Sequence, residues 1–102
     1  MATYADWAEA PSEARAERSR AVLMRGRERV RDVLEPHLGR EHALERANNI
    51  AQALALEDAE PEAVAFEMLR QLPTETRQRV AVAVRSAWLQ ELEAAELRAH
   101  NH

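Results

Sequence analysis

The amino-acid sequence predicts an all-α protein, a compact bundle of four main helices preceded by a short helical segment. Ala, Glu, Arg and Leu, which are all strong helix formers, supply 61 of the 102 residues. The β-branched residues, which favour strands, number only 11. A chain of this length is the size of one domain, so residues 1–102 are expected to form a single unit.

Prolines and glycines divide this domain into its predicted helices. Pro11 separates the short N-terminal helix from the first long one, which Pro36 ends before a turn at Gly39. Pro61 occupies the first position of the next helix, and Thr74 caps the last. The predicted helices cover residues 4–10, 13–35, 40–57, 61–72 and 75–99.

Apolar residues spaced at the helical period indicate which faces are buried. The helix over 61–72 is apolar around more than half of its circumference, so it is expected to be the central, most buried element. Gly26 lies within the apolar stripe of the helix over 13–35, where its cost of roughly 1 kcal/mol relative to Ala favours close approach of another helix. The main stripe of the last helix is expected to form core and contains Val80, Ala81, Val84, Trp88, Leu92 and Ala95.

The last helix also carries a second apolar stripe, formed by Val82 and Leu89, which points away from the first. One interpretation is that these residues pack beneath the N-terminal segment, against Tyr4 or Trp7. The other is that they form an interface with a second subunit or a partner protein, since a helix that is apolar on two sides must bury both. Trp7 is expected either to anchor its segment onto the bundle or to contact that partner.

Arginine is concentrated in the first long helix, although the chain as a whole carries a net charge of −4. The basic residues of this region form two rows, one on each edge of the apolar stripe: Arg20, Arg27 and Arg31 on one edge, and Arg15, Arg18, Arg25 and Arg29 on the other. Their aliphatic stems can cover the core while their guanidinium groups pair with acids of a neighbouring helix. The candidate acids lie around the predicted helices over 40–57 and 61–72 and late in the last helix: Glu57, Asp58, Glu60, Glu62, Glu67, Glu91, Glu93 and Glu96. Two alternatives remain, phosphate binding on a nucleic acid and complementarity to an acidic protein.

Residues 50–56, IAQALAL, resemble the first helix of helix-turn-helix repressors. The match covers only these residues, and it departs from the pattern at Ala55, where the turn glycine is expected. The stretch that follows is also too long for a tight turn. A recognition helix beginning at Pro61 would direct Glu62 and Glu67 towards phosphates, whereas base reading requires Arg, Asn, Gln or Lys. The resemblance implies a DNA-associated regulator, which is retained as the alternative function.

The residue types present give little basis for catalysis. The chain contains no cysteine, so it has no thiolate nucleophile, disulfide or thiolate zinc site. Glu35, His37, Glu41 and His42 cluster around one turn, but their spacing matches no metal motif, and His37 is better explained by interaction with the carboxyl end of a helix. We expect no catalytic residue, metal, cofactor or small-molecule substrate. Asn48 is expected to form a buried hydrogen bond or to specify a partner.

Targeting signals are also absent from the sequence. The N-terminus lacks the basic and apolar segments of a secretory signal, and no apolar run is long enough to span a membrane. The lack of cysteine suits the cytoplasm. All 14 basic residues are Arg, which suggests a GC-rich gene of bacterial or phage type.

Together these observations predict a small cytoplasmic interaction protein, such as a regulator, inhibitor or assembly factor. It is expected to dock on a protein partner, or on a second copy of itself as a homodimer, through one helix face. Val82 and Leu89 would supply the apolar contact, Arg18, Arg25 and Arg29 the charge complementarity, and Trp7 a further contact. For the DNA-binding alternative the candidates are Arg15, Arg18, Arg20, Arg25, Arg27, Arg29 and Arg31.

Overall fold

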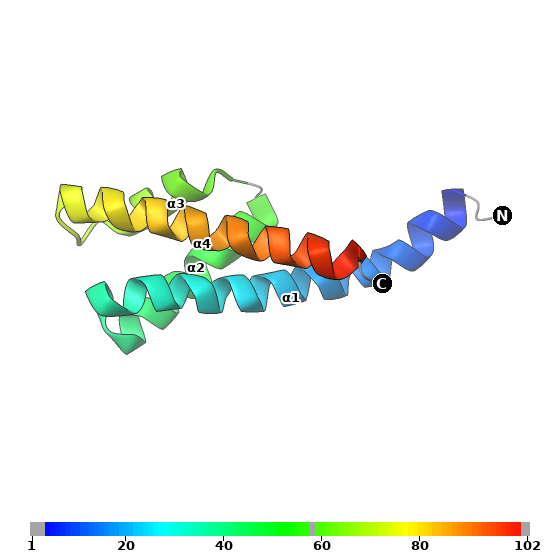
Figure 1. The fold of residues 1–102 in the computed structure, drawn as a ribbon, viewed down its shortest axis with the longest axis horizontal. Coiled ribbons are helices and arrows are strands. Elements are labelled where there is room, and N and C mark those ends of the chain that lie inside the picture. Colours follow the sequence, from blue (N-terminus) through cyan, green and yellow to red (C-terminus); the bar gives the residue numbers. More distant parts are fainter. Residues whose placement is uncertain (1–3, 58, 101–102) are drawn as a thin grey trace.

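Four helices, and no strand, make up the part of the chain that the structure describes (Figure 1). The structure is a computed structural model. It describes the backbone of residues 4–57 and 59–100 and the side chains of residues 19–57 and 59–98. The helices are α1 (Tyr4–Leu38), α2 (Arg40–Glu57), α3 (Pro61–Met68) and α4 (Thr74–His100). The predicted all-α class is therefore confirmed, and none of these helices is both long and apolar enough to cross a bilayer.

Helix α1 is one continuous helix of 35 residues, so the predicted break at Pro11 was wrong. An internal proline removes a single backbone N–H donor and bends a helix more often than it ends one. The flanking residues are mostly Ala, Glu and Arg, whose helix propensity offsets the loss. The N-terminal turns of α1 extend beyond the C-terminal end of α4 (Figure 1).

The end of α1 lies three residues later than predicted, at Leu38 instead of residue 35. Pro36 is accommodated inside the last turn, where it removes only one of the final hydrogen bonds. Gly39 then ends the helix: its φ is 81°, in the left-handed region that glycine adopts without strain. The N–H of Gly39 donates to the carbonyl oxygen of Glu35 at 3.0 Å, which satisfies one of the last carbonyls of the helix.

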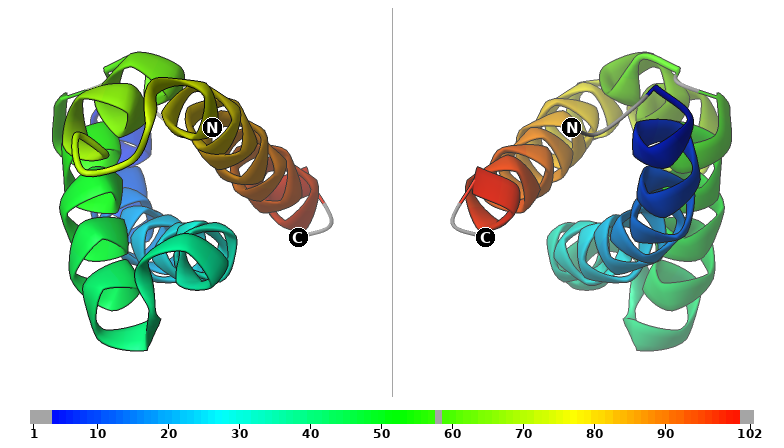
Figure 2. Two further views of the ribbon diagram at one scale, coloured as in Figure 1. Left: turned by 90° about the vertical axis from the view of Figure 1, so that its left-hand side faces the viewer. Right: turned by 90° about the vertical axis from the view of Figure 1, so that its right-hand side faces the viewer.

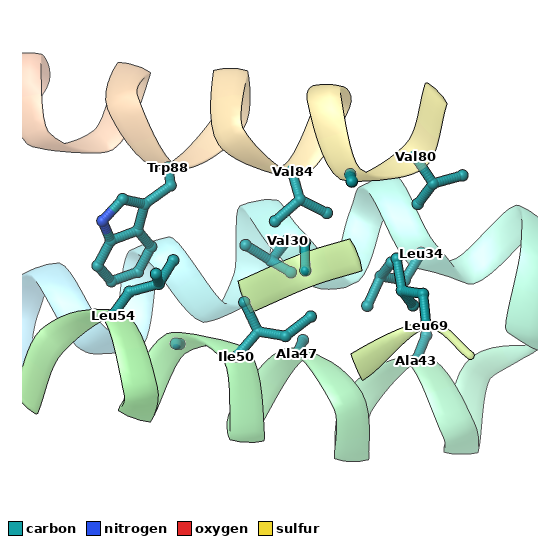
Figure 3. Close-up of a cluster of buried hydrophobic side chains, with 13 residues drawn as sticks. Val30, Leu34, Ala43, Ala47, Ile50, Leu54, Leu69, Val80, Val84 and Trp88 are labelled. Atoms are coloured by element: carbon teal, nitrogen blue, oxygen red, sulfur yellow. The ribbon is translucent and has the colours of Figure 1, made fainter. Parts of the chain in front are cut away.

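The core lies where α1, α2 and α4 face one another (Figure 3). Helix α1 packs against both α2 and α4, and α3 packs mainly against α4 (Figures 1 and 2). Trp88 of α4 is buried over Gly26 of α1, which confirms the close approach predicted at this glycine. The most buried hydrophobic residues come from all four helices and from the residue after α3: Val30, Leu34, Ala43, Ala47, Ile50, Ala51, Leu54, Ala65, Leu69, Val80, Ala81, Val84 and Trp88.

Helix α3 is peripheral and short, in contrast to the central element predicted over 61–72. It has eight residues, and Ala65 is its only buried hydrophobic residue. The backbone leaves the helix at Leu69, where φ is −108° and ψ is 38°, and this residue is fully buried. Pro73 also disfavours helical geometry at the residue before it, so the helix cannot continue to that point.

Candidate protein-docking site

Three exposed apolar side chains form a stripe on α4. Val82, Leu89 and Leu92 retain 44%, 43% and 40% of their accessible surface, respectively. Spacings of seven and three residues place them on one side of the helix. We call these three residues the outer face of α4. No other part of the described chain covers this stripe, so Val82 and Leu89 are exposed to solvent.

Leu92 belongs to this stripe because Glu91 occupies the buried position predicted for it. Glu91 retains 1% of its accessible surface, and its two carboxylate oxygens accept from different arginines. Arg29 Nε of α1 donates to one oxygen at 2.9 Å, and Arg98 Nη2 donates to the other at 2.8 Å. Glu91 lies three residues after Trp88 and seven after Val84, on the core side of α4. The prediction that Leu92 is core was therefore wrong.

Opposite charges flank the two ends of the outer face. Arg79 and Arg85 are exposed in the N-terminal half of α4, and Glu93 and Glu96 are exposed in the C-terminal half. Arg85 Nε lies 3.8 Å from a carboxylate oxygen of Glu60, but both side chains are more than half exposed. An ion pair of that length and exposure contributes little, so Arg85 remains able to meet another partner.

Several arginines of α1 are already occupied within the fold. Arg29 pairs with Glu91, which confirms the predicted pairing between helices for this residue. Arg27 Nη1 donates to Asn48 Oδ1 of α2 at 3.4 Å, so the amide forms a half-buried hydrogen bond. Arg31 Nη2 lies 3.3 Å from Asp32 Oδ1. Each of these three guanidinium groups makes one contact with a described side chain, while Nε of Arg27 and Nε of Arg31 are buried without a hydrogen-bond partner among the described residues.

Other residues of the predicted binding surfaces are exposed or lie outside the described side chains. Arg20 and Arg25 are exposed and make no ion pair with any side chain that the structure describes. The side chains of Trp7, Arg15 and Arg18 lie outside the described residues.

The predicted docking surface combined Val82 and Leu89 with Arg18, Arg25 and Arg29, and Arg29 does not lie on the side of α4 where the two apolar residues are exposed. Arg29 lies at the junction of α1 and α4, bound to Glu91. Residues two apart on an α-helix point in nearly opposite directions, so Leu89 is directed away from that junction. Arg29 is therefore not a charged neighbour of the apolar stripe, whereas Arg85 and Glu96 of α4 lie on the same side of the helix as Leu89.

The helix-turn-helix interpretation receives no support from α3. The carboxylate of Glu60 caps this helix by accepting from the backbone N–H of Glu62 at 3.2 Å and of Ala63 at 2.8 Å. These are the donors that the start of a recognition helix would offer to a phosphate. Arg70 donates a hydrogen bond to Glu67, and this bond together with its charge holds the pKa of Glu67 below its usual range.

Two open pockets lie on the described part of the chain. A groove of about 390 Å³ between α2 and α3 is lined mainly by polar side chains, with Leu56 and Met68 among them. A shallow pocket of about 500 Å³ lies against the first turns of α4. No group of three or more His, Asp or Glu side chains in the described residues converges as metal ligands do. His37, predicted just past the end of its helix, lies within the last turn of α1.

No family model, curated protein or solved structure matches this chain. Functional inference therefore depends on its own surface.

Proposed function

We propose that this protein is a non-catalytic interaction module that docks on another protein through the outer face of α4. The observation that carries the proposal is the exposure of Val82, Leu89 and Leu92 together on one stripe. Exposed apolar residues scattered singly need no explanation, but a continuous stripe on a long helix is typical of helix-face recognition. Such a module would serve as a regulator, an inhibitor or an assembly factor, in the cytoplasm of a bacterium or in a phage-infected cell.

Charged residues beside the stripe would orient the partner. Arg85 and Glu96 lie within one or two turns of Leu89 and Leu92 on the same side of α4. Paired charges at the rim of an interface accelerate association and select its register more than they raise affinity. Arg29 has no part in this role because it holds Glu91.

A double substitution on the stripe tests the proposal. Val82→Glu with Leu89→Glu places two carboxylates in the apolar contact, where a desolvated charge without a partner is costly. We expect this variant to differ from the native protein in two measurements. One is the native mass, which reports self-association, and the other is the set of proteins captured from lysate. Leu56→Glu is the matched control because Leu56 is 81% exposed and lies on α2. If the double variant remains folded and changes neither measurement, the proposal is wrong.

Binding of nucleic acid is the second candidate, favoured by the exposure of Arg20 and Arg25 on α1. Several phosphate contacts would make affinity for duplex DNA fall steeply with added salt. A titration of labelled duplex DNA at low and at moderate salt, with Arg20→Glu and Arg25→Glu as the test variant, decides this candidate. Absence of binding at low salt eliminates it.

A further inference from the structure

We propose that the occupant of the outer face of α4 is a second copy of this chain, with its α4 running antiparallel to the first. This inference rests on the proposed function, since it assumes that the outer face is a docking site. It is argued from the order of charges along α4 and from the register that the apolar residues allow.

Charge is distributed asymmetrically along the exposed side of α4. Over residues 79–96, Arg79 and Arg85 come before the centre of the stripe, and Glu93 and Glu96 come after it. The exposed Glu75 of the first turn lies outside this stretch. A parallel pair of such helices would set arginine against arginine and glutamate against glutamate. An antiparallel pair sets the basic half of one copy against the acidic half of the other, twice, because the arrangement has a two-fold axis.

The apolar residues define a register that agrees with this charge order. Counting in heptads, Val82 and Leu89 occupy one seam position and Arg85 and Leu92 the other. Antiparallel helices pair one seam position with the other, so Val82 lies against Leu92 of the second copy. Leu89 then lies level with Arg85 of the second copy, whose aliphatic stem can cover it.

The same register brings the flanking charges together. Arg79 of one copy comes within one helical turn of Glu93 and Glu96 of the second copy, and the two-fold axis repeats the contact. Arg79 and Glu93 lie beside the seam, whereas Glu96 occupies the same heptad position as Val82 and Leu89, at the end of the contact. The apolar contact and the ion pairs thus favour the same arrangement.

The area of this contact predicts a weak dimer. From Arg79 to Glu96 the helix rises by about 26 Å at its usual rise per residue. A strip of that length with three apolar residues per copy is smaller than the roughly 800 Å² per partner of a standard interface. Association is therefore expected to be reversible, dependent on concentration and weakened by salt.

Sedimentation of the full chain over a range of concentrations tests the first part of the inference. The expected mass rises from the 11.6 kDa of the monomer towards twice that value, and added salt lowers it. A chain that stays monomeric at every concentration overturns the dimer. That result leaves the docking proposal intact, because capture of a different protein that depends on Val82 and Leu89 would still support it.

Complementary charge reversals test the antiparallel register. Arg79→Glu puts glutamate against Glu93 of the second copy at both symmetric sites, and Glu93→Arg puts arginine against Arg79. Each variant alone is expected to dimerise about ten-fold more weakly. An equimolar mixture of the two should associate more tightly than either variant alone, because both contacts between positions 79 and 93 of the mixed pair then join opposite charges.

The control for this experiment is Arg40→Glu, which makes the same change of net charge at an exposed position of α2. It is expected to leave dimerisation unchanged. Circular dichroism establishes that each variant is folded before its mass is measured. If both charge reversals are folded and the mixture associates no better than either alone, the antiparallel arrangement is wrong. A dimer that is indifferent to Val82→Glu with Leu89→Glu also overturns the inference, since it must use another surface.

Discussion

At the scale of single residues, Gly26 shows how a costly helix residue becomes necessary. A Cβ added at this position would lie 2.3 Å from Cζ3 of Trp88, closer than carbon atoms can approach. The indole is itself buried, so it cannot swing into solvent to make room. The absence of a side chain at Gly26 thus allows the largest core residue of α4 to lie directly on α1.

Gly26→Ala is therefore expected to destabilise the protein, although Ala is the better helix former. Overpacking a well-filled core costs about 1–3 kcal/mol, against a propensity gain of roughly 1 kcal/mol. Urea unfolding followed by circular dichroism measures the difference. A second substitution, Trp88→Leu, provides the control: in its background the same Gly26→Ala change should cost less or become stabilising. Equal costs in both backgrounds would show that the indole is not the cause.

Glu91 is the other residue whose role depends on its neighbours. It is the only buried charged side chain in the described chain, and both of its partners are arginines that stay partly exposed. Through Arg29, this one carboxylate joins α1 to α4. Removing one partner of a fully buried ion pair lowers the free energy of unfolding by several kcal/mol. The loss is smaller here because water screens the partly exposed side chains of Arg29 and Arg98.

Glu91→Gln is expected to lower the free energy of unfolding by about 1–2 kcal/mol, because a neutral amide cannot bind two guanidinium groups equally well. Glu93→Gln is the matched control, since Glu93 is exposed on the same helix, and it should change stability by less than about 0.5 kcal/mol. Both values come from denaturant unfolding. The assigned role of Glu91 fails if the two variants are equally stable.

At the scale of elements, Arg77 of α4 makes two polar contacts with Phe66 of α3, in addition to the packing between the two helices. Arg77 donates from Nε to the carbonyl oxygen of Phe66, and its guanidinium carbon lies 3.8 Å from the centre of the Phe66 ring. Helix α3 is too short to be stable alone, so its position depends on contacts of this kind. Phe66 is itself partly buried and packs against the core cluster.

Arg77→Lys tests this attachment more sharply than a truncation does. Lysine keeps the charge but lacks the planar guanidinium group, which can stack on the ring and at the same time donate a hydrogen bond to the carbonyl oxygen. The expected loss is about 1 kcal/mol of stability, with faster amide exchange in α3 measured by NMR. Arg79→Lys, two residues away on an exposed side of α4, serves as the control and should change neither quantity.

At the scale of the whole molecule, the protein is long and narrow, with extents of 57 × 22 × 20 Å. Its radius of gyration is 15.7 Å, larger than the roughly 13 Å of a globular domain of this length. Two long helices account for this shape, since α1 and α4 contain 35 and 27 residues. A long narrow body leaves much of each helix uncovered, which is why a stripe such as the outer face of α4 can stay exposed.

Thermal stability is expected to depend on protein concentration if the outer face pairs two copies. Mass action stabilises any folded state that associates, so the midpoint of thermal unfolding should rise as concentration rises. The Val82→Glu, Leu89→Glu variant should show a midpoint independent of concentration. Scanning calorimetry at several concentrations measures both. Identical behaviour of the two proteins would argue against any self-association through α4.

The sequence by itself determined those features that one helix can specify alone. Helix-forming composition and proline positions predicted an all-α protein with α2 at 40–57 and α3 beginning at Pro61, and periodicity placed Val80, Val84 and Trp88 in the core. The close approach of another helix at Gly26 could be predicted because the low helix propensity of glycine has to be offset by a tertiary contact. Each of these properties depends on local propensity or on the period of one helix.

Only the tertiary structure decided the features that depend on what a second helix presents. It buried Glu91 in place of Leu92, because Arg29 and Arg98 meet the carboxylate there. It moved α3 to the periphery and directed Arg29 away from the side on which Leu89 lies. Periodicity identifies which residues share a face, but the contacts available from neighbouring helices determine whether that face is core, ion pair or surface.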